Sequence, residues 1–180
     1  MKTLRLLMFF LACPGFLTAL TGADTPADKE AARKATLEHL RKVLDAAAKL
    51  EDVNVTFRQS ETQPYNFVGF IEDGLKNSER LEVVVGVTAF ETIGFRVYPH
   101  YKGGYINVDK AKDGPALMRK LLRMTNRGFM YWGIDETNDV FSGYTITLES
   151  GFPEEVVVVV LRSLRNTDGF VGELRADVDG

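Results

Sequence analysis

LEVVVGVTAF, the stretch from Leu81 to Phe90, decides the fold of this chain. It is almost continuously apolar and β-branched, which is typical of a strand near the centre of a sheet. Residues 92–98 form the next apolar segment, which Pro99 ends. These two segments are close together in the chain, so they predict neighbouring antiparallel strands.

Working outward, the same patterns predict an α+β fold in which helices pack on an antiparallel sheet of about 5–6 strands. The other expected strands have the apolar alternation or aromatic content of half-buried strands, and the last two form a hairpin across Asp135 to Asp139. Apolar residues at three- and four-residue spacing predict the helices. Strands are expected at residues 53–57, 65–71, 129–134 and 141–149, and helices at residues 29–50, 113–126 and 153–165.

The last of these helices is a conflict between two signals. Five valines from Val156 to Val160 favour a strand, because β-branched side chains fit a sheet. Pro153, Glu154 and Glu155 favour a helix start, since acidic groups stabilise the positive end of the helix dipole. The apolar residues that follow continue at helical spacing, so we predict a helix.

The N-terminus has the three parts of an export signal. A basic start with Lys2 and Arg5 precedes an apolar run, and the run ends at Thr21-Gly22-Ala23. We expect residues 1–23 to be a signal peptide, residues 24–29 a linker, and residues 30–180 a single α+β domain. The predicted location is therefore periplasmic or secreted. An alternative is a lipoprotein anchored through Cys13, which Leu11-Ala12 precede.

Composition limits the chemistry of the mature chain. Cys13 is the only cysteine, and cleavage after Ala23 would remove it together with any thiol or disulfide chemistry. The same cleavage removes two cations, so the net charge changes from −3 to −5. This acidity argues against nucleic acid as a partner. No apolar stretch of membrane-spanning length follows the signal, and about 157 residues can bury a core without disulfides.

A family resemblance is carried by the second half of the chain. A leucine-rich helix ends on Leu121-Leu122-Arg123-Met124-Thr125-Asn126, followed by F-x-x-W-G-x-D at residues 129–135 and Gly-Phe-Pro-Glu-Glu at residues 151–155. Over Leu81 to Leu164 the chain resembles the bacterial family of sensory-transduction regulators, whose fold is similar to that of type III secretion chaperones. The resemblance implies a chaperone-like fold and non-catalytic protein binding. It carries over no catalytic residue, and the export signal departs from secretion chaperones, which are cytosolic.

The segment from Lys110 to Arg127 is basic within an acidic chain and is one candidate binding surface. Its six cations face only Asp113, which gives a local charge of +5. Such a surface could bind anionic lipid head groups, cell-wall polymers or an acidic partner, while the simpler interpretation is a solvated helix face paired with Asp and Glu elsewhere. Three- and four-residue spacing predicts that one side of the helix carries Arg119, Lys120, Arg123 and Arg127.

A second candidate is the aromatic segment from Tyr98 to Tyr105. Its side chains surround a Gly-Gly turn, and tyrosines offer flat apolar faces with hydroxyl tips. Such a loop could hold a peptide or a sugar ring, whereas the simpler interpretation is a hairpin that covers a sheet edge. The candidate residues here are Tyr98, His100, Tyr101, Tyr105 and Trp132.

Signals for catalysis and cofactors are missing from the sequence. It has no Gly-x-Ser-x-Gly, Ser-x-x-Lys or His-Glu-x-x-His motif and no phosphate-binding glycine loop. Oxygen ligands alternate from Asp135 to Asp139 as in calcium loops, but Val140 and Ile146 stand where such loops need Gly and Glu. We therefore predict no enzyme activity, no cofactor and no metal.

Together these observations predict an exported, non-enzymatic binding protein, chaperone-like or regulatory. Its partner would be a protein or peptide of anionic character, bound through the sheet face or the basic helix. The alternative is a small-ligand or glycan-binding module that uses the Tyr98–Tyr105 loop, and a third interpretation is a small hydrolase with an unrecognised acid site. Self-association as a homodimer is left open.

Overall fold

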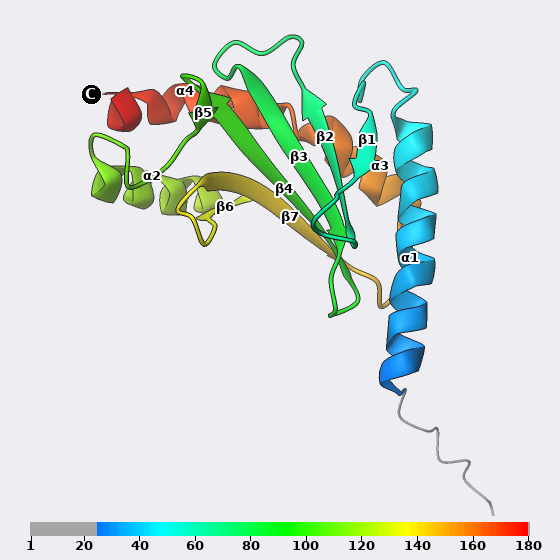
Figure 1. Cartoon of the computed structure of the whole chain (residues 1–180). Helices are drawn as coiled ribbons and strands as arrows, with labels where there is room; N and C mark the ends of the chain where they lie inside the picture. The colour runs from blue at the N-terminus through cyan, green and yellow to red at the C-terminus, as the bar shows by residue number, and fades with distance from the viewer. Residues whose placement is uncertain (1–24, 180) are drawn as a thin grey trace, which may run out of the picture.

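The computed structural model describes residues 25–179, which fold into one antiparallel seven-stranded sheet with helices packed on it (Figure 1). The α+β prediction is confirmed. The strands are β1 (Phe57–Gln59), β2 (Asn66–Ile71), β3 (Arg80–Val87), β4 (Thr92–Tyr101), β5 (Gly104–Tyr105), β6 (Tyr131–Ile134) and β7 (Val140–Thr147). The helices are α1 (Pro26–Ala47), α2 (Gly114–Arg127), α3 (Glu154–Ser163) and α4 (Asn166–Asp179).

The valine-rich segment that begins at Leu81 forms most of β3, which lies at the centre of the sheet. The strand order is β1-β2-β3-β4-β7-β6, and β5 adds a short pairing at the end of β4. Strand β4 extends to Tyr101, so the prediction that Pro99 ends it is wrong. Pairing with β7 stops at Val97 and pairing with β5 begins at His100. Pro99 therefore has a single neighbouring strand, and proline is tolerated at such edge positions.

The two faces of the sheet have different surroundings. Along β3, buried residues alternate with half-buried ones, and the buried set faces the helices. Figure 1 shows α3 and α4 behind the strands, while the near face carries no helix among the described elements. We call this near face the open face. The register places Val84 and Arg96 side by side on it, because they are paired residues of β3 and β4.

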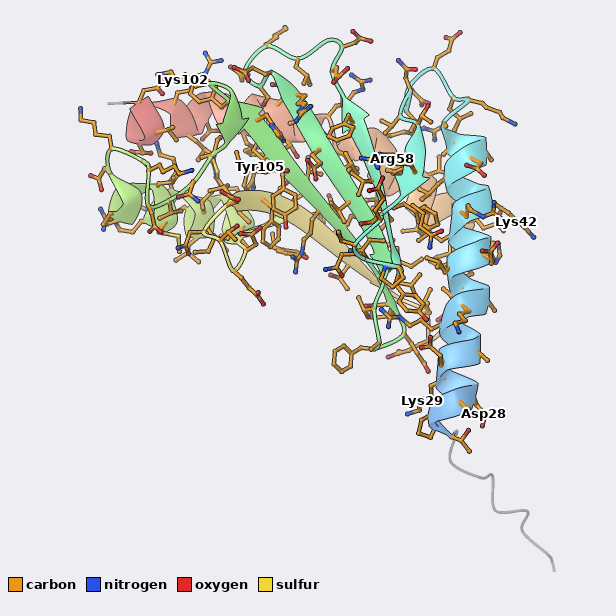
Figure 2. The ribbon with its side chains drawn as sticks, viewed as in Figure 1. Asp28, Lys29, Lys42, Arg58, Lys102 and Tyr105 are labelled. Carbon is orange, nitrogen blue, oxygen red and sulfur yellow. The ribbon has the colours of Figure 1, made fainter. Side chains whose placement is uncertain are left out.

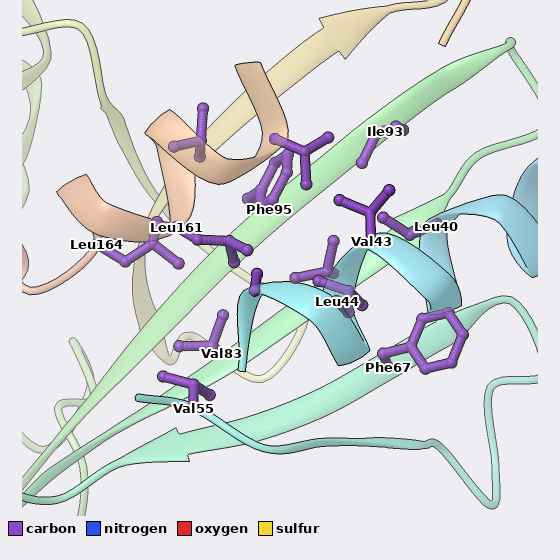
Figure 3. Close-up of a cluster of buried hydrophobic side chains, with 14 of the residues drawn as sticks. Leu40, Val43, Leu44, Val55, Phe67, Val83, Ile93, Phe95, Leu161 and Leu164 are labelled. Atoms are coloured by element: carbon purple, nitrogen blue, oxygen red, sulfur yellow. The ribbon is translucent and has the colours of Figure 1, made fainter. Parts of the chain in front are cut away.

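A first core lies between the sheet and helices α1 and α3 (Figure 3). Leu40 and Leu44 of α1 meet Val83 and Phe95 of the sheet, and all four are buried. Full burial stabilises each such side chain by about 1.5–3 kcal/mol. The valine-rich segment is helical, as predicted, and it contributes Val157, Val160, Leu161 and Leu164 to this core.

A second core lies under the other end of the sheet, between α2, α4 and strand β6. Leu117, Leu121 and Met124 supply the buried side of α2, and Val171 and Leu174 supply that of α4. One continuous sheet therefore carries both cores.

Helix α4 was not expected from the sequence, because Gly169 and Gly172 lower its intrinsic helix propensity. The structure gives a reason for the second glycine. A β-carbon at Gly172 would lie 2.8 Å from the side-chain oxygen of Asn77. Glycine therefore allows the loop between β2 and β3 to pack closely on α4.

Two expectations at the start of the domain are wrong. The residues expected to form a linker, 24–29, are helical from Pro26, because a capping box fixes the helix start. In it, the Asp28 carboxylate accepts the backbone N–H of Thr25 at 3.0 Å, and Thr25 Oγ1 accepts that of Asp28 at 3.2 Å. The strand expected at residues 53–57 is also wrong, since pairing begins only at Phe57.

The expected signal peptide, its cleavage site and the Cys13 anchor lie outside the described residues. Over residues 25–179, no helix is both long and apolar enough to cross a membrane.

Candidate functional site

The four predicted basic residues of α2 fall into two pairs, according to whether they form ion pairs with α4. Lys120 forms an ion pair with Asp177 of α4 and donates to the backbone oxygen of Glu173 at 2.8 Å. Arg127 donates to the Glu173 carboxylate at 2.7 Å. For these two cations the simpler interpretation, a helix face paired with acidic residues elsewhere, therefore holds, and they hold α4 against α2.

The other pair, Arg119 and Arg123, is exposed. Arg119 and Arg123 have no ion-pair partner within the described part of the chain. Leu122 lies between them in sequence and is 66% exposed. Phe129 lies two residues beyond the helix end and is 95% exposed. We call Arg119, Leu122, Arg123 and Phe129 the α2 surface.

The local sequence explains why α2 presents these residues. The Asp113 side chain accepts the backbone N–H of Ala116 at 2.8 Å, which fixes the helix start. Leu117, Leu121 and Met124 then turn toward the core. Residues 119, 122 and 123 share the opposite side, since positions three and four apart are neighbours on a helix.

The aromatic segment is a strand, a tight turn and a strand, and not an open loop. Lys102 and Gly103 have positive φ angles of 55° and 81°, as a two-residue hairpin turn requires. Strand alternation then divides the candidates between the two faces of the sheet. Tyr98, His100 and Tyr105 lie on the open face, whereas Tyr101 faces α4 and donates to Asp179 at 2.6 Å.

His100 is buried and packs against Tyr105, with the ring centroids 4.3 Å apart. Its Nε2 lies 3.6 Å from Glu82 and makes no hydrogen bond with any described residue. Burial, followed by the charge of Arg80, lowers the pKa of His100, while Glu82 and Glu79 oppose the shift. This histidine is therefore neutral near pH 7.

Tyr105 donates its hydroxyl to the same carboxylate, Glu82, at 2.7 Å. Burial and this hydrogen bond raise the pKa of Tyr105 to about 12. The bond holds the tyrosine ring across the end of β3, where Figure 2 shows it over the near face of the sheet. The residue is 40% exposed and remains available to a ligand.

Trp132 does not belong to a binding surface. It is only 6% exposed and packs in the second core against Phe170, with ring centroids 5.8 Å apart. Its backbone N–H donates to the Thr125 hydroxyl at 2.8 Å. The prediction of Trp132 as a binding residue is therefore wrong, and its neighbour Tyr131 is the residue of this strand that reaches the open face.

A groove of about 810 Å³ crosses the open face. Val84, Gly86 and Gly94 form part of its lining, and the tyrosine side chains of the sheet line its other end. Sequence reasoning missed this groove, although glycines at paired positions of neighbouring strands were a signal for it. Its remaining lining includes Arg96, Tyr98, Tyr105, Tyr131, Asp135 and Asp139.

The acidic hairpin turn is satisfied by its own loop. Asp135 accepts the backbone N–H groups of Thr137 and Asp139, at 2.9 and 3.0 Å. Asp139 also accepts the Asn107 side-chain amide at 2.8 Å. Nowhere in residues 25–179 do three or more histidine, cysteine, aspartate or glutamate side chains gather as a metal would require.

The chain matches no protein-family model and no curated protein. Two solved structures are similar to it in fold. The crystal structure of the ExsC–ExsE complex aligns over 77% of this chain and 94% of the other, at 16% identity and a TM-score of 0.45. The structure of the HopA1–SchA chaperone–effector complex aligns over 82% and 98%, at 11% identity and a TM-score of 0.46. The sensory-transduction regulator family stays a prediction.

Proposed function

We propose that this protein is a non-enzymatic, chaperone-like binding protein whose α2 surface binds an acidic amphipathic segment of another protein. The observation that carries the proposal is Leu122 and Phe129, two large apolar side chains exposed on and just beyond the helix that carries Arg119 and Arg123. Large apolar side chains exposed at one end of a helix are candidates for contact with a partner. Burying these two side chains against a partner would supply the affinity.

The charge of the surface defines the partner further. Arg119 and Arg123 flank Leu122, and neither is neutralised within residues 25–179. A partner with carboxylates on both sides of an apolar residue would match this order. Such charge complementarity steers association and fixes the register of the bound segment.

A second copy of the chain fits this surface poorly. In a two-fold dimer the same patch faces itself. Arg119 and Arg123 would then meet the same arginines of the other copy, which is repulsive. The proposed partner is therefore a different protein.

The proposal also includes export of the protein from the cytoplasm. The basic start, apolar run and small-residue end of residues 1–23 support a location outside the cytoplasm. The partner would meet this protein in the periplasm or beyond the cell. Mass spectrometry of the mature protein tests this part. A mass that matches a chain starting at Asp24 supports cleavage after Ala23. A mass that matches a chain with a lipid-modified Cys13 would show a lipoprotein anchor in place of that cleavage.

Binding is tested with a labelled helical peptide, about four turns long, that carries leucine at every third or fourth position and glutamate beside each leucine. The control peptide has the same leucines with lysine in place of glutamate. We expect anisotropy to show saturable binding of the acidic peptide alone. The double variant Arg119→Glu/Arg123→Glu should weaken it about 10-fold or more, since two charge pairs change from attraction to repulsion.

The matched control is Lys42→Glu, a charge reversal on the outward side of α1 (Figure 2). It should leave binding of the acidic peptide within about twofold of the wild type, because an isolated surface charge contributes little. Leu122→Ser and Phe129→Ser should each weaken binding without lowering the melting temperature, as both side chains are exposed. Equal binding of both peptides, or no loss in the double variant, would reject the α2 surface.

A further inference from the structure

The open face carries a flat tyrosine whose position depends on a glycine. Tyr131 of β6 is paired with Gly143 of β7. A β-carbon at Gly143 would lie 2.6 Å from Cζ of Tyr131 and 2.7 Å from its hydroxyl oxygen. The tyrosine ring therefore lies across the glycine backbone, and its other face is left for the groove. The residue is 36% exposed.

The same arrangement repeats two residue pairs further along, at the next pair on this face. Phe141 lies across Gly133, where a β-carbon would be 3.2 Å from the end of the phenylalanine ring. The rings of Tyr131 and Phe141 meet edge to face at 6.0 Å between centroids, and Tyr98 follows at 5.6 Å. Aromatic contacts of this geometry stabilise one another. The rings therefore form a rigid platform across three strands.

An arginine stands beside this platform. Arg96 is paired with Gly143, so the glycine alone separates it from Tyr131 across the sheet. The strand spacing puts the α-carbons of these two residues roughly 10 Å apart. The Arg96 guanidinium lies over Phe141, 4.7 Å from the ring centroid.

The donors of Arg96 are largely unused. Among the described residues, its hydrogen bonding is limited to a long contact of 3.4 Å to the Tyr98 hydroxyl, and it makes no ion pair with any described carboxylate. The nearby Asp135 and Asp139 accept groups of their own hairpin. The groove therefore presents an aromatic platform and a cation with free N–H groups.

We propose that this groove binds a carboxylated sugar, such as a uronic acid, with its ring face on Tyr131 and its carboxylate on Arg96. The apolar face of a pyranose stacks on a flat aromatic ring, as other apolar groups do. A guanidinium binds a carboxylate through two parallel N–H bonds. Because the Tyr131 ring lies over Gly143, which separates Tyr131 from Arg96, a pyranose stacked on that ring would have its carboxylate beside the guanidinium.

A sugar fits this site better than a peptide does. The backbone groups of β4 and β7 are paired with strands on both sides, and a peptide strand added at the edge strand β6 would extend the sheet and not lie on its face. A peptide lying across them would leave its own N–H and C=O groups without backbone partners. Sugar hydroxyls need only side chains and water.

The experiment titrates full-length mature protein with trigalacturonic acid and follows backbone amide shifts by NMR. The trimethyl ester of the same sugar is the uncharged control. We expect saturable shifts at residues of β4, β6 and β7 with the acid, and at least about tenfold weaker binding of the ester, because the ester cannot form the charged bonds. Arg96→Gln should weaken binding of the acid by a similar factor.

Two further variants separate stacking from folding. Tyr131→Phe keeps the ring and should bind within about twofold of the wild type, whereas Tyr131→Ala should lose binding about tenfold or more. Arg58→Gln is the matched control for Arg96, because Arg58 is exposed and lies in the same cross-strand row at the far edge of the sheet (Figure 2). It should leave binding unchanged.

Three results would overturn the proposal: no saturable shift with the acid, equal binding of acid and ester, or displacement of the acid by the acidic peptide described above. Because Arg119 and Arg123 lie on α2, their double variant should still bind the sugar. The failure of either proposal can therefore be told apart from the failure of the other.

Discussion

Replacing Asp168 should destabilise the fold, because its carboxylate accepts several hydrogen bonds from another part of the chain. This carboxylate lies in α4 and is 7% exposed. It accepts the backbone N–H groups of Lys76, Asn77 and Ser78 at 2.8, 2.9 and 2.7 Å, so it closes the loop between β2 and β3 against the helix. The sequence around Asp168 does not reveal this role, because the three donors lie 90–92 residues away in sequence.

The size of the effect follows from these bonds. Asp168→Ala leaves three partly buried N–H groups without their acceptor. Each costs about 1 kcal/mol where water can reach it and more where it cannot, so the loss is roughly 3 kcal/mol. For a chain of this size the melting temperature would fall by about 6–12 °C. Asp168→Asn keeps one acceptor oxygen and should lose about half as much.

The stability that these hydrogen bonds contribute should also depend on pH. Burial alone would raise the pKa of Asp168, but the N–H bonds from Lys76, Asn77 and Ser78 outweigh it, and the net pKa is lowered. A lowered folded-state pKa stabilises the fold above the unfolded value near 3.9, and this contribution is lost as the pH falls through the folded pKa. The stability gap between wild type and Asp168→Asn should therefore be full at about pH 6 and shrink below about pH 4.

Urea unfolding at about pH 6 and about pH 3, followed by circular dichroism, measures both effects. The control is Asp45→Asn, which changes an exposed carboxylate on α1 and should cost less than about 0.5 kcal/mol. A loss below about 1 kcal/mol for Asp168→Ala, or a gap that does not depend on pH, would refute the reasoning.

Two further predictions concern the open face. Gly143→Ala should destabilise the protein by about 1–3 kcal/mol, because the new methyl group would meet the Tyr131 ring at 2.6 Å and the Phe95 backbone oxygen at 2.8 Å; thermal unfolding measures this, and an unchanged melting temperature would contradict it. The lowered pKa of His100 means that the unfolded chain binds its proton more readily. Stability should therefore fall as the pH drops below about 6.5 and level off below the folded pKa, and His100→Gln should remove that slope in urea titrations from about pH 7 to about pH 5.

Much of the fold could be predicted because local patterns and tertiary packing agree. The valine-rich run after Leu81 indicated a central strand, and β3 is central, although helices cover only one of its faces. Acidic residues after Pro153 indicated a helix despite five valines, and the core accepts Val157 and Val160 on its side of that helix. These elements were predictable because the local sequence pattern and the tertiary packing favour the same structure for each of them.

Other elements depend on partners distant in sequence. Helix α4 contains two glycines and has no local signal strong enough to predict it, yet the loop that holds Asn77 packs where Gly172 has no side chain. The basic helix was predicted, but spacing alone could not show that Lys120 and Arg127 pair with α4 while the other two arginines do not. Such pairing depends on the position of an element that the sequence pattern did not reveal.

Strand β6 shows most clearly what each level decides. The sequence by itself determined that Tyr131 and Trp132 point to opposite faces, because successive side chains alternate along a strand. Only the tertiary structure decided which face the helices cover, and so which ring became core and which became surface. The physical reason is that alternation is a property of the local backbone, whereas burial depends on where α2 and α4, encoded elsewhere in the chain, come to rest.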